Sequence, residues 1–358
     1  MSFQTESRDL NMKKFKLDSL VRENVKRLKP YSSARDEFKD FDRDMVFLDA
    51  NENPFENGVN RYPDPHQRSL KSVLAEQKGV QTARTLLGNG SDEVLDLIFR
   101  AFCEPHKDNV ITLPPTYGMY KVLAETNAVE NREVLLGEDF QPVVEHILHQ
   151  SDEHTKLLFL CSPNNPTGNG FDAGKVEELM LKFNGLVIID EAYIDFSSKE
   201  GWSPRLGEFP NLIITQTLSK AYGMAGVRLG ICYASEAIIT ILKKIKPPYN
   251  VNQLTQQRAL ERVAQPNRVQ QEVARILRER DNLIRALGQI PFVQTIYPTD
   301  ANFVLVKVDK ADLRYQQLVS HGVVVRNRSS QPLCDNTLRF TIGTEQENKK
   351  LIEVLRTI

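Results

Sequence analysis

The feature that most constrains this chain of 358 residues is an alternation of short apolar runs with helical stretches between about residues 60 and 246. Each apolar run has the length of a buried strand, so we expect strands at Val110–Leu113, Lys156–Cys161, Leu186–Asp190, Leu212–Thr217 and Leu229–Tyr233. We expect helices between them at Glu93–Phe102, Tyr120–Thr126 and Val176–Phe183. This alternation predicts a mostly parallel sheet with helices on both faces.

The pattern changes at Pro247-Pro248, because proline fits neither a helix interior nor a central strand. A long helical segment follows, from about Gln253 to Leu287. Beyond it we expect a terminal helix preceded by short strands at Phe303–Val308, Gly322–Arg326 and Thr337–Ile342. The prediction is therefore an α/β protein with a large domain over residues 46–248 and a smaller α+β domain over 249–358. Residues 1–45 are expected to form an arm that contributes part of the small domain.

The composition argues against several classes of protein. Lys and Arg number 46 and Asp and Glu 47, so the chain lacks the basic excess typical of nucleic-acid binding. The four cysteines are far apart and form no Cys-x-x-Cys pair, which favours reduced thiols in the cytoplasm and predicts no metal site. The longest apolar runs have the size of a strand, and the N-terminus has no apolar leader. We therefore expect neither a membrane span nor export.

Polar residues follow three consecutive strands of the predicted sheet. The first strand runs into Asn164-Asn165-Pro166-Thr167-Gly168, the second ends in Asp190-Glu191-Ala192-Tyr193, and the third ends in Leu218-Ser219-Lys220. Ligands of open α/β sheets bind beyond the carboxyl ends of the strands. We therefore expect an amide, a carboxylate and an amine to meet at one edge of the sheet.

These groups suit one kind of cofactor chemistry. A lysine amine such as that of Lys220 can form an imine with an aldehyde cofactor. A carboxylate such as that of Asp190 can keep a pyridine nitrogen protonated, which makes the ring an electron sink. The side chains of Asn165 and Tyr193 can bond a phenolic oxygen on the same ring. The pattern therefore predicts a pyridine aldehyde cofactor at this edge.

Such a cofactor also needs a phosphate anchor. The segment Gly88-Asn89-Gly90-Ser91-Asp92-Glu93 opens a predicted helix, whose N-terminus offers free N–H groups and the positive end of a dipole. Arg228, eight residues after Lys220, adds a fixed cation with two-pronged geometry. We expect Tyr117, after the strand Val110–Leu113, to stack on the ring.

Each of these motifs is common alone, because Asn-Pro-Thr-Gly is most often a turn and a Gly-rich segment before a helix is most often a cap. Their occurrence together, in this order, is far more specific. The series Gly-x-Gly-Ser-Asp-Glu, Pro-Pro-Thr-Tyr, Asn-Asn-Pro-Thr-Gly, Asp-Glu-Ala-Tyr, Thr-Leu-Ser-Lys and Gly-x-Arg-x-Gly resembles the fold-type I aminotransferases over nearly the whole chain. That resemblance implies pyridoxal 5'-phosphate (PLP) as cofactor.

The resemblance also assigns roles to the residues. It implies that Lys220 forms the Schiff base with PLP and moves the proton, that Asp190 holds the pyridinium nitrogen, and that Tyr193 supports them. The implied cofactor contacts are Tyr117 on the ring face, Asn165 and Tyr193 at the ring oxygen, and Gly90, Ser91, Asp92, Ser219 and Arg228 at the phosphate, with Thr217 as a minor contact.

Flanking segments narrow the resemblance. Pro30-Tyr31-Ser32-Ser33-Ala34-Arg35, Leu48–Pro54, Arg61-Tyr62-Pro63-Asp64-Pro65 and a C-terminal run from Val323 to Thr344 resemble the histidinol-phosphate aminotransferase family. This implies transamination of L-histidinol phosphate with 2-oxoglutarate, giving imidazole acetol phosphate and L-glutamate. One departure is the turn Asn53-Pro54-Phe55-Glu56-Asn57-Gly58, where many relatives read Asn-Pro-Phe-Gly-Pro.

The same resemblance implies a set of substrate contacts: Tyr31, Asn51, Tyr62, Asn165, Arg326 and Arg339. Tyr62 is expected to come from the partner subunit, which implies a homodimer with shared active sites. Two guanidinium groups, from Arg326 and Arg339, can hold the phosphate of the donor or the carboxylates of the acceptor. Arg328 is an alternative to Arg326 in this role.

Three other functions use part of the same pattern. An aromatic amino-acid aminotransferase would share the whole cofactor set. A phosphothreonine decarboxylase of the same fold would also bind a phosphorylated amine. A PLP-binding regulator would need a DNA-binding module, and the N-terminal arm has no helix-turn-helix pattern.

Overall fold

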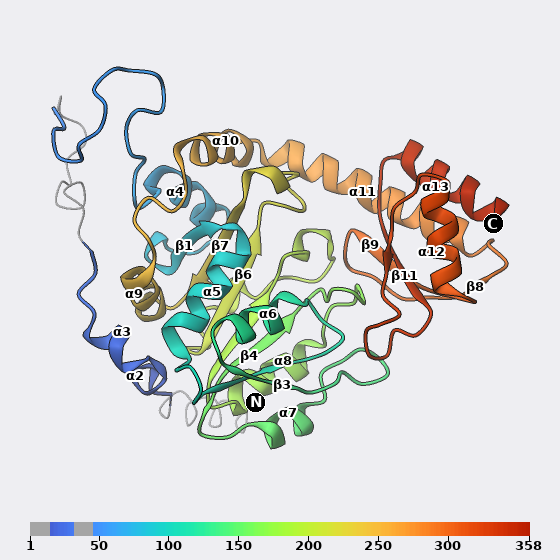
Figure 1. Cartoon of the computed structure of the whole chain (residues 1–358), viewed down its shortest axis with the longest axis horizontal. Helices are drawn as coiled ribbons and strands as arrows, with labels where there is room; N and C mark the ends of the chain where they lie inside the picture. Colours follow the sequence, from blue (N-terminus) through green and yellow to red (C-terminus); the bar gives the residue numbers. More distant parts are fainter. Residues whose placement is uncertain (1–14, 32–45) are drawn as a thin grey trace.

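The computed structural model describes residues 15–31 and 46–358, which form a large and a small domain, each built around one sheet (Figure 1). The large sheet has seven strands in the order β1-β7-β6-β5-β4-β2-β3. Their bounds are β1 Thr85–Asn89, β2 Asn109–Thr112, β3 Glu130–Glu133, β4 Thr155–Cys161, β5 Leu186–Asp190, β6 Leu212–Thr217 and β7 Leu229–Ala234. The five strands predicted from apolar runs are confirmed, each to within about one residue.

The direction of the strands is also as predicted. The pairs β2–β3, β2–β4, β4–β5 and β5–β6 are parallel, whereas β7 runs antiparallel to both β6 and β1. A mostly parallel sheet of this kind is covered on both faces, so its strands are apolar along their whole length. The predicted α/β class is therefore confirmed.

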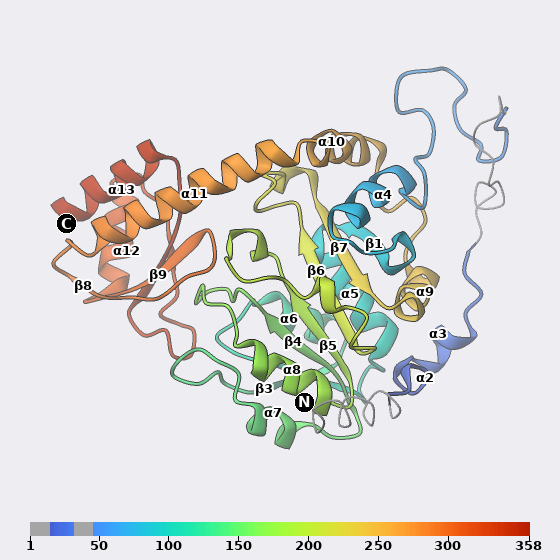
Figure 2. The same ribbon diagram turned by 180° about the vertical axis from the view of Figure 1, so that it is seen from behind.

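Helices cover both faces of the large sheet, as Figures 1 and 2 show from opposite sides. One face packs against α4 Arg68–Gln77, α7 Val144–Gln150, α8 Ala173–Lys182 and α10 Gln253–Val263. The other packs against α5 Gly90–Phe102, α6 Met119–Thr126 and α9 Glu236–Ile245.

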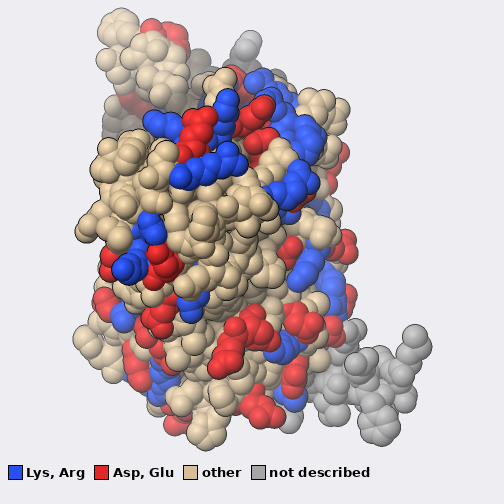
Figure 3. All heavy atoms as spheres, turned by 90° about the vertical axis from the view of Figure 1, so that its right-hand side faces the viewer, with Lys and Arg blue, Asp and Glu red and all other residues tan. Residues whose placement is uncertain are grey.

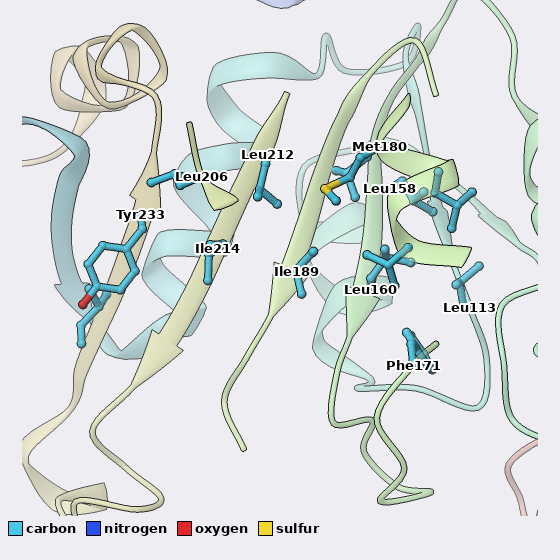
Figure 4. Packing of buried hydrophobic residues seen from close by; sticks show 14 of the residues in the cluster. Leu113, Leu158, Leu160, Phe171, Met180, Ile189, Leu206, Leu212, Ile214 and Tyr233 are labelled. Carbon is cyan, nitrogen blue, oxygen red and sulfur yellow. The ribbon is translucent and has the colours of Figure 1, made fainter. Parts of the chain in front are cut away.

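Successive residues of β5 and β6 alternate between the two cores. Ile189, Leu212 and Ile214 point into the first core, together with Leu160 and Met180 (Figure 4). Ile188 and Ile213 lie in the second core, on the opposite face of the sheet. This period of two is that of a strand buried on both sides, and it fixes the register of the central strands.

The N-terminal arm differs from our expectation. We expected part of residues 1–45 to complete the small domain, but helices α2 Leu17–Leu20 and α3 Glu23–Arg27 pack on the large domain. Leu20, Val21 and Val25 are buried in the core that contains α5 and α9. Arg22 fixes this contact through its ion pair with Glu104, at 3.2 Å. The rest of the arm lies outside the described residues.

The small domain follows the long helix α11 Pro266–Leu287, the orange helix that leads from α10 to the C-terminal end of the chain in Figure 1. Its sheet is antiparallel, in the order β10-β11-β9-β8, and helices α12 and α13 pack against it. The bounds are β8 Val293–Ile296, β9 Phe303–Val308, α12 Ala311–Ser320, β10 Arg326–Asn327, β11 Thr337–Thr341 and α13 Glu345–Thr357.

Two expectations for this region are wrong in detail. The predicted single helix over residues 253–287 is two helices, because Pro266 cannot donate a backbone hydrogen bond and starts α11 instead. The predicted strand Gly322–Arg326 is reduced to β10. Val323 N–H closes the end of α12 by donating to Leu318 O at 2.9 Å, so it is not available to a strand ladder.

The outer surface of the small domain carries both signs of charge. Figure 3 shows Lys and Arg side chains beside Asp and Glu side chains over this end of the molecule. Mixed charge of this kind forms a solvated surface without a large field of one sign. No helix among the described residues is long and apolar enough to cross a membrane.

A close contact between β7 and the start of α5 yields a first prediction. A Cβ atom added at Gly230 would overlap the backbone of Gly90 and Ser91. Gly230→Ala should therefore lower the free energy of unfolding by about 1–3 kcal/mol, as measured by urea denaturation. Gly226→Ala is the control, because nothing lies within 4 Å of its Cβ position. An equal loss in the two variants would contradict this reading of the contact.

Candidate active site

Three adjacent strands bring the predicted functional groups to one edge of the large sheet. Asn165 follows β4, Asp190 ends β5, and Lys220 follows β6. One pocket at this edge is lined by Ser91, Asp92, Tyr117, Cys161, Asn165, Asp190, Ala192, Tyr193, Thr217, Ser219, Lys220 and Arg228. Of the eleven residues predicted to contact the cofactor, all except Gly90 line this pocket. Gly90 lies beside it, at the start of α5.

Lys220 has an exposed side chain, and its amine lies in a cationic neighbourhood. Burial lowers the pKa of its ammonium group, and the positive charges of Arg339 and Arg228 lower it further. Its Nζ atom lies 5.6 Å from the centre of the Tyr193 ring. A lowered pKa makes the neutral, nucleophilic amine more available, which is what imine formation requires.

Asp190 is almost completely buried, with 3% of its surface exposed. Its Oδ2 atom accepts a hydrogen bond from the Tyr120 hydroxyl at 2.8 Å, and its Oδ1 atom accepts one from Ala192 N–H at 3.2 Å. Burial raises the pKa of this carboxyl group, whereas the hydrogen bond from Tyr120 opposes the rise. The carboxylate is therefore held in one orientation at the floor of the pocket.

The turn between β1 and α5 forms a cradle closed by Arg228. Gly90 has a φ of +74°, and its N–H donates to Arg228 O at 3.0 Å. A Cβ atom at Gly90 would lie 2.5 Å from Nη2 of Arg228, so the guanidinium occupies the space that a side chain would take. Arg228 Nη1 donates to Ser219 Oγ at 3.3 Å, and Nη2 lies 3.5 Å from Asp92 Oδ2. A cation and a helix N-terminus thus face the same space, which suits a phosphate group.

Two tyrosines bound the pocket. The Tyr117 hydroxyl donates to Asp92 Oδ1 at 3.1 Å, which fixes its ring beside the start of α5. Tyr193 is buried, and its ring meets Phe303 of the small domain edge to face at 5.1 Å. The contact between Tyr193 and Phe303 belongs to a small cluster of apolar residues between the two domains: Tyr193, Phe196, Ala221, Ala301 and Phe303.

Arg339 of the small domain contacts Asn165, a residue that lines the pocket. Its Nη1 atom donates to Asn165 Oδ1, and its guanidinium carbon lies 4.8 Å from the centre of the Phe303 ring. Its Nε atom is buried and has no hydrogen-bond partner among residues 15–31 and 46–358. Burial and the charge of Arg328 lower the pKa of Arg339 to about 10. A partly buried guanidinium whose Nε atom has no partner among the described residues suits an anion.

Arg326 and Arg328, the two candidates for the second substrate cation, differ in burial. Arg326 is opposite Arg339 in the β10–β11 ladder, but it is exposed. Arg328 is partly buried, and its Nε atom also lacks a partner in the described part of the chain. Burial lowers the pKa of Arg328, and the charge of Arg326 lowers it further. All three guanidinium groups therefore lie near one another on the small domain.

Of the six predicted substrate residues, only Asn165 lines this pocket. Arg339 contacts Asn165, whereas Arg326, Tyr31, Asn51 and Tyr62 do not line the pocket. Tyr31 is 74% exposed and does not line it. Asn51 and Tyr62 line a separate hollow with Asn252, Gln253 and Leu254. The Tyr62 ring is half exposed and stacks on Tyr249 at 4.6 Å. Within a single chain these residues therefore remain apart from Lys220.

The sequence reasoning missed three contributors. Cys161 and Ala192 line the pocket, and Tyr120 bonds Asp190 from below. Cys161 is the last residue of β4 and is opposite Asp190 in the β4–β5 ladder, so its position at the edge was open to prediction. Tyr120 is three residues after Tyr117, and its N–H donates to Tyr117 O at 3.3 Å, so both belong to the turn that leads into α6.

Comparisons with known proteins agree with this fold. The family model for class I and II aminotransferases matches residues 39–355. A histidinol-phosphate aminotransferase from Flavobacterium johnsoniae is 63% identical over 97% of this chain and 100% of its own length. The chain therefore belongs to the histidinol-phosphate aminotransferase family, within the class I and II aminotransferases.

Solved structures extend the comparison to the fold. The histidinol-phosphate aminotransferase from Clostridium acetobutylicum has a TM-score of 0.77 at 24% identity, covering 84% of this chain and 90% of that one. The Sinorhizobium meliloti enzyme, solved in complex with pyridoxal-5'-phosphate, has a TM-score of 0.74 at 23% identity and covers 83% of each chain. These likenesses support the PLP transferase fold of type I.

The burial of Asp190 predicts how stability depends on pH. Its pKa in the folded state is raised above the unfolded value, so the ionised carboxylate costs stability at neutral pH. In the cofactor-free protein, Asp190→Asn should raise the free energy of unfolding at pH 7 by on the order of 1 kcal/mol. The gain should shrink as the pH falls and should vanish only below about 3, where the carboxyl group is protonated in both states.

Unfolding at several pH values measures this difference. Asp172→Asn is the control, because Asp172 caps α8 from the surface and asparagine caps a helix equally well. A destabilisation by Asp190→Asn that is the same at every pH would contradict the assigned cost of the buried charge.

Proposed function

We propose that this chain transfers the amino group of L-histidinol phosphate to 2-oxoglutarate, giving imidazole acetol phosphate and L-glutamate, a step of histidine biosynthesis. Membership of the histidinol-phosphate aminotransferase family supports the reaction. The observation that carries the proposal is the contact of Arg339 with Asn165. This contact brings a guanidinium that can bind the substrate anion next to the pocket of Lys220 and Asp190.

The residues of the pocket fit PLP. The cradle at Gly90, where Arg228 excludes any side chain, suits the phosphate group. The buried carboxylate of Asp190 suits a pyridinium nitrogen, and the Asn165 and Tyr193 side chains suit the ring oxygen. Tyr117 is positioned to cover one face of the ring. When bound, PLP supplies an aldehyde carbon and a ring that accepts electrons.

Different side chains have different roles in the proposed reaction. Lys220 Nζ would hold the aldehyde carbon of the cofactor, and as a free amine it would move the proton of the substrate α-carbon. The negative charge of Asp190 would favour a protonated ring nitrogen. Arg228 and the start of α5 would hold the phosphate group.

The substrate anion would be held by Arg339 and a second arginine. We favour Arg328 over Arg326 for that second cation, because Arg328 is partly buried and has an unsatisfied Nε atom, whereas Arg326 is exposed. One cationic pocket would then bind the phosphate of the donor in the first half-reaction and a carboxylate of the acceptor in the second.

We also propose a homodimer in which Tyr62 reaches the active site of the partner. The segment that leads to Tyr62 exposes Val46, Leu48 and Phe55 by 79–87% of their surfaces. In Figure 1 this segment loops out beyond α4, away from the body of the chain. Large apolar side chains displayed in this way favour burial against a second subunit.

The cysteines of the chain favour a reducing compartment. Cys103, Cys161, Cys232 and Cys334 are all buried and unpaired by disulfides. Thiols of this kind are typical of cytoplasmic proteins, so the cytoplasm is the location that we propose.

The decisive experiment compares amino donors. The purified protein with PLP should turn over L-histidinol phosphate with a kcat/KM at least about tenfold above that for L-phenylalanine, because only the phosphate pairs with the arginines. O-phospho-L-threonine should release no carbon dioxide. A clear preference for phenylalanine would favour an aromatic aminotransferase, and decarboxylation of phosphothreonine would favour a lyase.

Lys220→Ala is the control for the site itself, because it should abolish turnover and the absorbance of the lysine-linked cofactor. Retention of that absorbance would show that another lysine holds PLP.

The shared anion pocket makes a separate prediction. Arg339→Ala should raise the KM for histidinol phosphate and for 2-oxoglutarate, each by about 10–100-fold, because one cation serves both anions. Arg328→Ala should have a smaller effect in the same direction. Arg275→Ala, on the exposed surface of α11, is the matched control. Stopped-flow measurement of each half-reaction separates the two anions, and a loss confined to the glutamate half would contradict a shared pocket.

A further inference from the structure

A tyrosine hydroxyl lies beneath Asp190, on the side away from the pocket. Tyr120 is completely buried and does not line the pocket. Its hydroxyl is 2.8 Å from Asp190 Oδ2. The cofactor roles proposed above do not use this residue, although it makes the shortest hydrogen bond to the Asp190 side chain among the described residues.

The position of this hydroxyl is fixed by the packing of its ring. Tyr120 stacks on Phe159 at 4.9 Å with an interplanar angle of 18°, and Phe159 stacks in turn on Phe99 at 5.1 Å. The Tyr117 ring meets the Tyr120 ring edge to face at 5.6 Å. Tyr120 N–H also donates to Tyr117 O at 3.3 Å. One turn of backbone thus places the Tyr117 ring beside the cofactor pocket and the Tyr120 hydroxyl under Asp190.

The direction of the hydrogen bond follows from the ionisation of the two groups. Burial raises the pKa of Tyr120 well above its ordinary value, so the phenol stays neutral and keeps its proton. The Asp190 carboxylate can only accept. Tyr120 therefore donates, and a carboxylate that accepts this bond is a weaker base than one without it.

We propose that Tyr120 is a positioning residue that orients the Asp190 carboxylate and limits its basicity, so that the proton between Asp190 and the cofactor stays on the ring nitrogen. This inference rests on the proposed function, because it takes Asp190 as the partner of the pyridine nitrogen. Without the Tyr120 hydroxyl, Asp190 would be the stronger base and would draw that proton toward itself. The ring would then carry less positive charge and accept electrons less well.

Several other ionisable groups face Asp190, and each must be considered in a titration. They come from α5, the segment before α6, β4 and the segments after β5 and β6: Asp92, Tyr117, Cys161, Tyr193 and Lys220. Burial raises the pKa of Tyr117, Cys161 and Tyr193, so these three stay neutral over the working range. Asp92 and Lys220 remain, and a substitution at Tyr120 removes neither of these charged groups.

The test uses the PLP-loaded protein and the pH dependence of the cofactor absorbance. The linking nitrogen of Lys220 loses its proton more readily when the ring is positively charged. Tyr120→Phe, which removes only the hydroxyl, should therefore shift this titration to higher pH by roughly 0.5–1 unit. It should also lower kcat by about tenfold, with KM changed by less than about threefold. A titration that coincides with the wild-type curve would overturn the proposal.

Tyr233→Phe is the matched control. Tyr233, labelled in Figure 4, is also completely buried in the large domain, and its hydroxyl has no hydrogen-bond partner in the described part of the chain. Removing it should leave both the titration and kcat unchanged. An equal shift in the two variants would show a general effect of lost hydroxyl groups and would also overturn the proposal.

Two further variants separate this inference from the proposed function. If Asp190→Asn leaves the cofactor absorbance and kcat as in the wild type, the proposed role of Asp190 itself fails. If Asp190→Asn is impaired, adding Tyr120→Phe should produce little further shift, because the bond acts through Asp190. Fully additive effects would show that Tyr120 acts elsewhere. Tyr120→His keeps a ring with an N–H donor and should recover part of the shift, which also covers the case that Tyr120→Phe does not fold.

Discussion

The burial of one negative charge, that of Asp190 at the carboxyl end of β5, organises the active site. A carboxylate with 3% exposure is stable only if donors and cations compensate for the lost water. Two donors are supplied within bonding distance, by the Tyr120 hydroxyl and Ala192 N–H. Each depends on a different element, since Tyr120 belongs to α6 and Ala192 follows β5 directly. The large domain thus holds the charge ready for a cation that enters from the pocket.

Much of this arrangement could be predicted from the sequence. Strands β4, β5 and β6 are fully buried, so their apolar runs mark their bounds closely, and parallel strands end at the same edge of the sheet. The polar residues after these strands therefore had to converge. By contrast, strands β1, β3 and β8 were missed. The four residues of β3 are polar or charged, and β8 is only half buried, because an edge strand has one paired side and needs no continuous apolar run.

Other parts of the site could not be predicted from local pattern. Tyr120 reads as a core residue of an amphipathic helix, and nothing in the spacing of apolar residues shows that its hydroxyl meets Asp190, seventy residues later. The preference for Arg328 over Arg326 depends on where β10 ends, and that depends on how Val323 caps α12. Tyr31, Asn51 and Tyr62 remain outside the pocket of a single chain. A resemblance can suggest their roles, but the contacts of one chain contain no information on a second subunit.

The electrostatics of the pocket link substrate binding to the state of Lys220. Desolvation lowers the pKa of Lys220, and the charges of Arg339 and Arg228 lower it further, which favours the neutral amine while no anion is bound. An anion that pairs with Arg339 cancels much of the positive charge felt by Lys220, so the proton affinity of the amine rises. Lys220 needs a high proton affinity at that stage, because it must then remove a proton from the α-carbon of the bound substrate. While no anion is bound, the charge of Arg339 favours the neutral, nucleophilic form of Lys220. When the anion of the substrate pairs with Arg339, Lys220 becomes a stronger base.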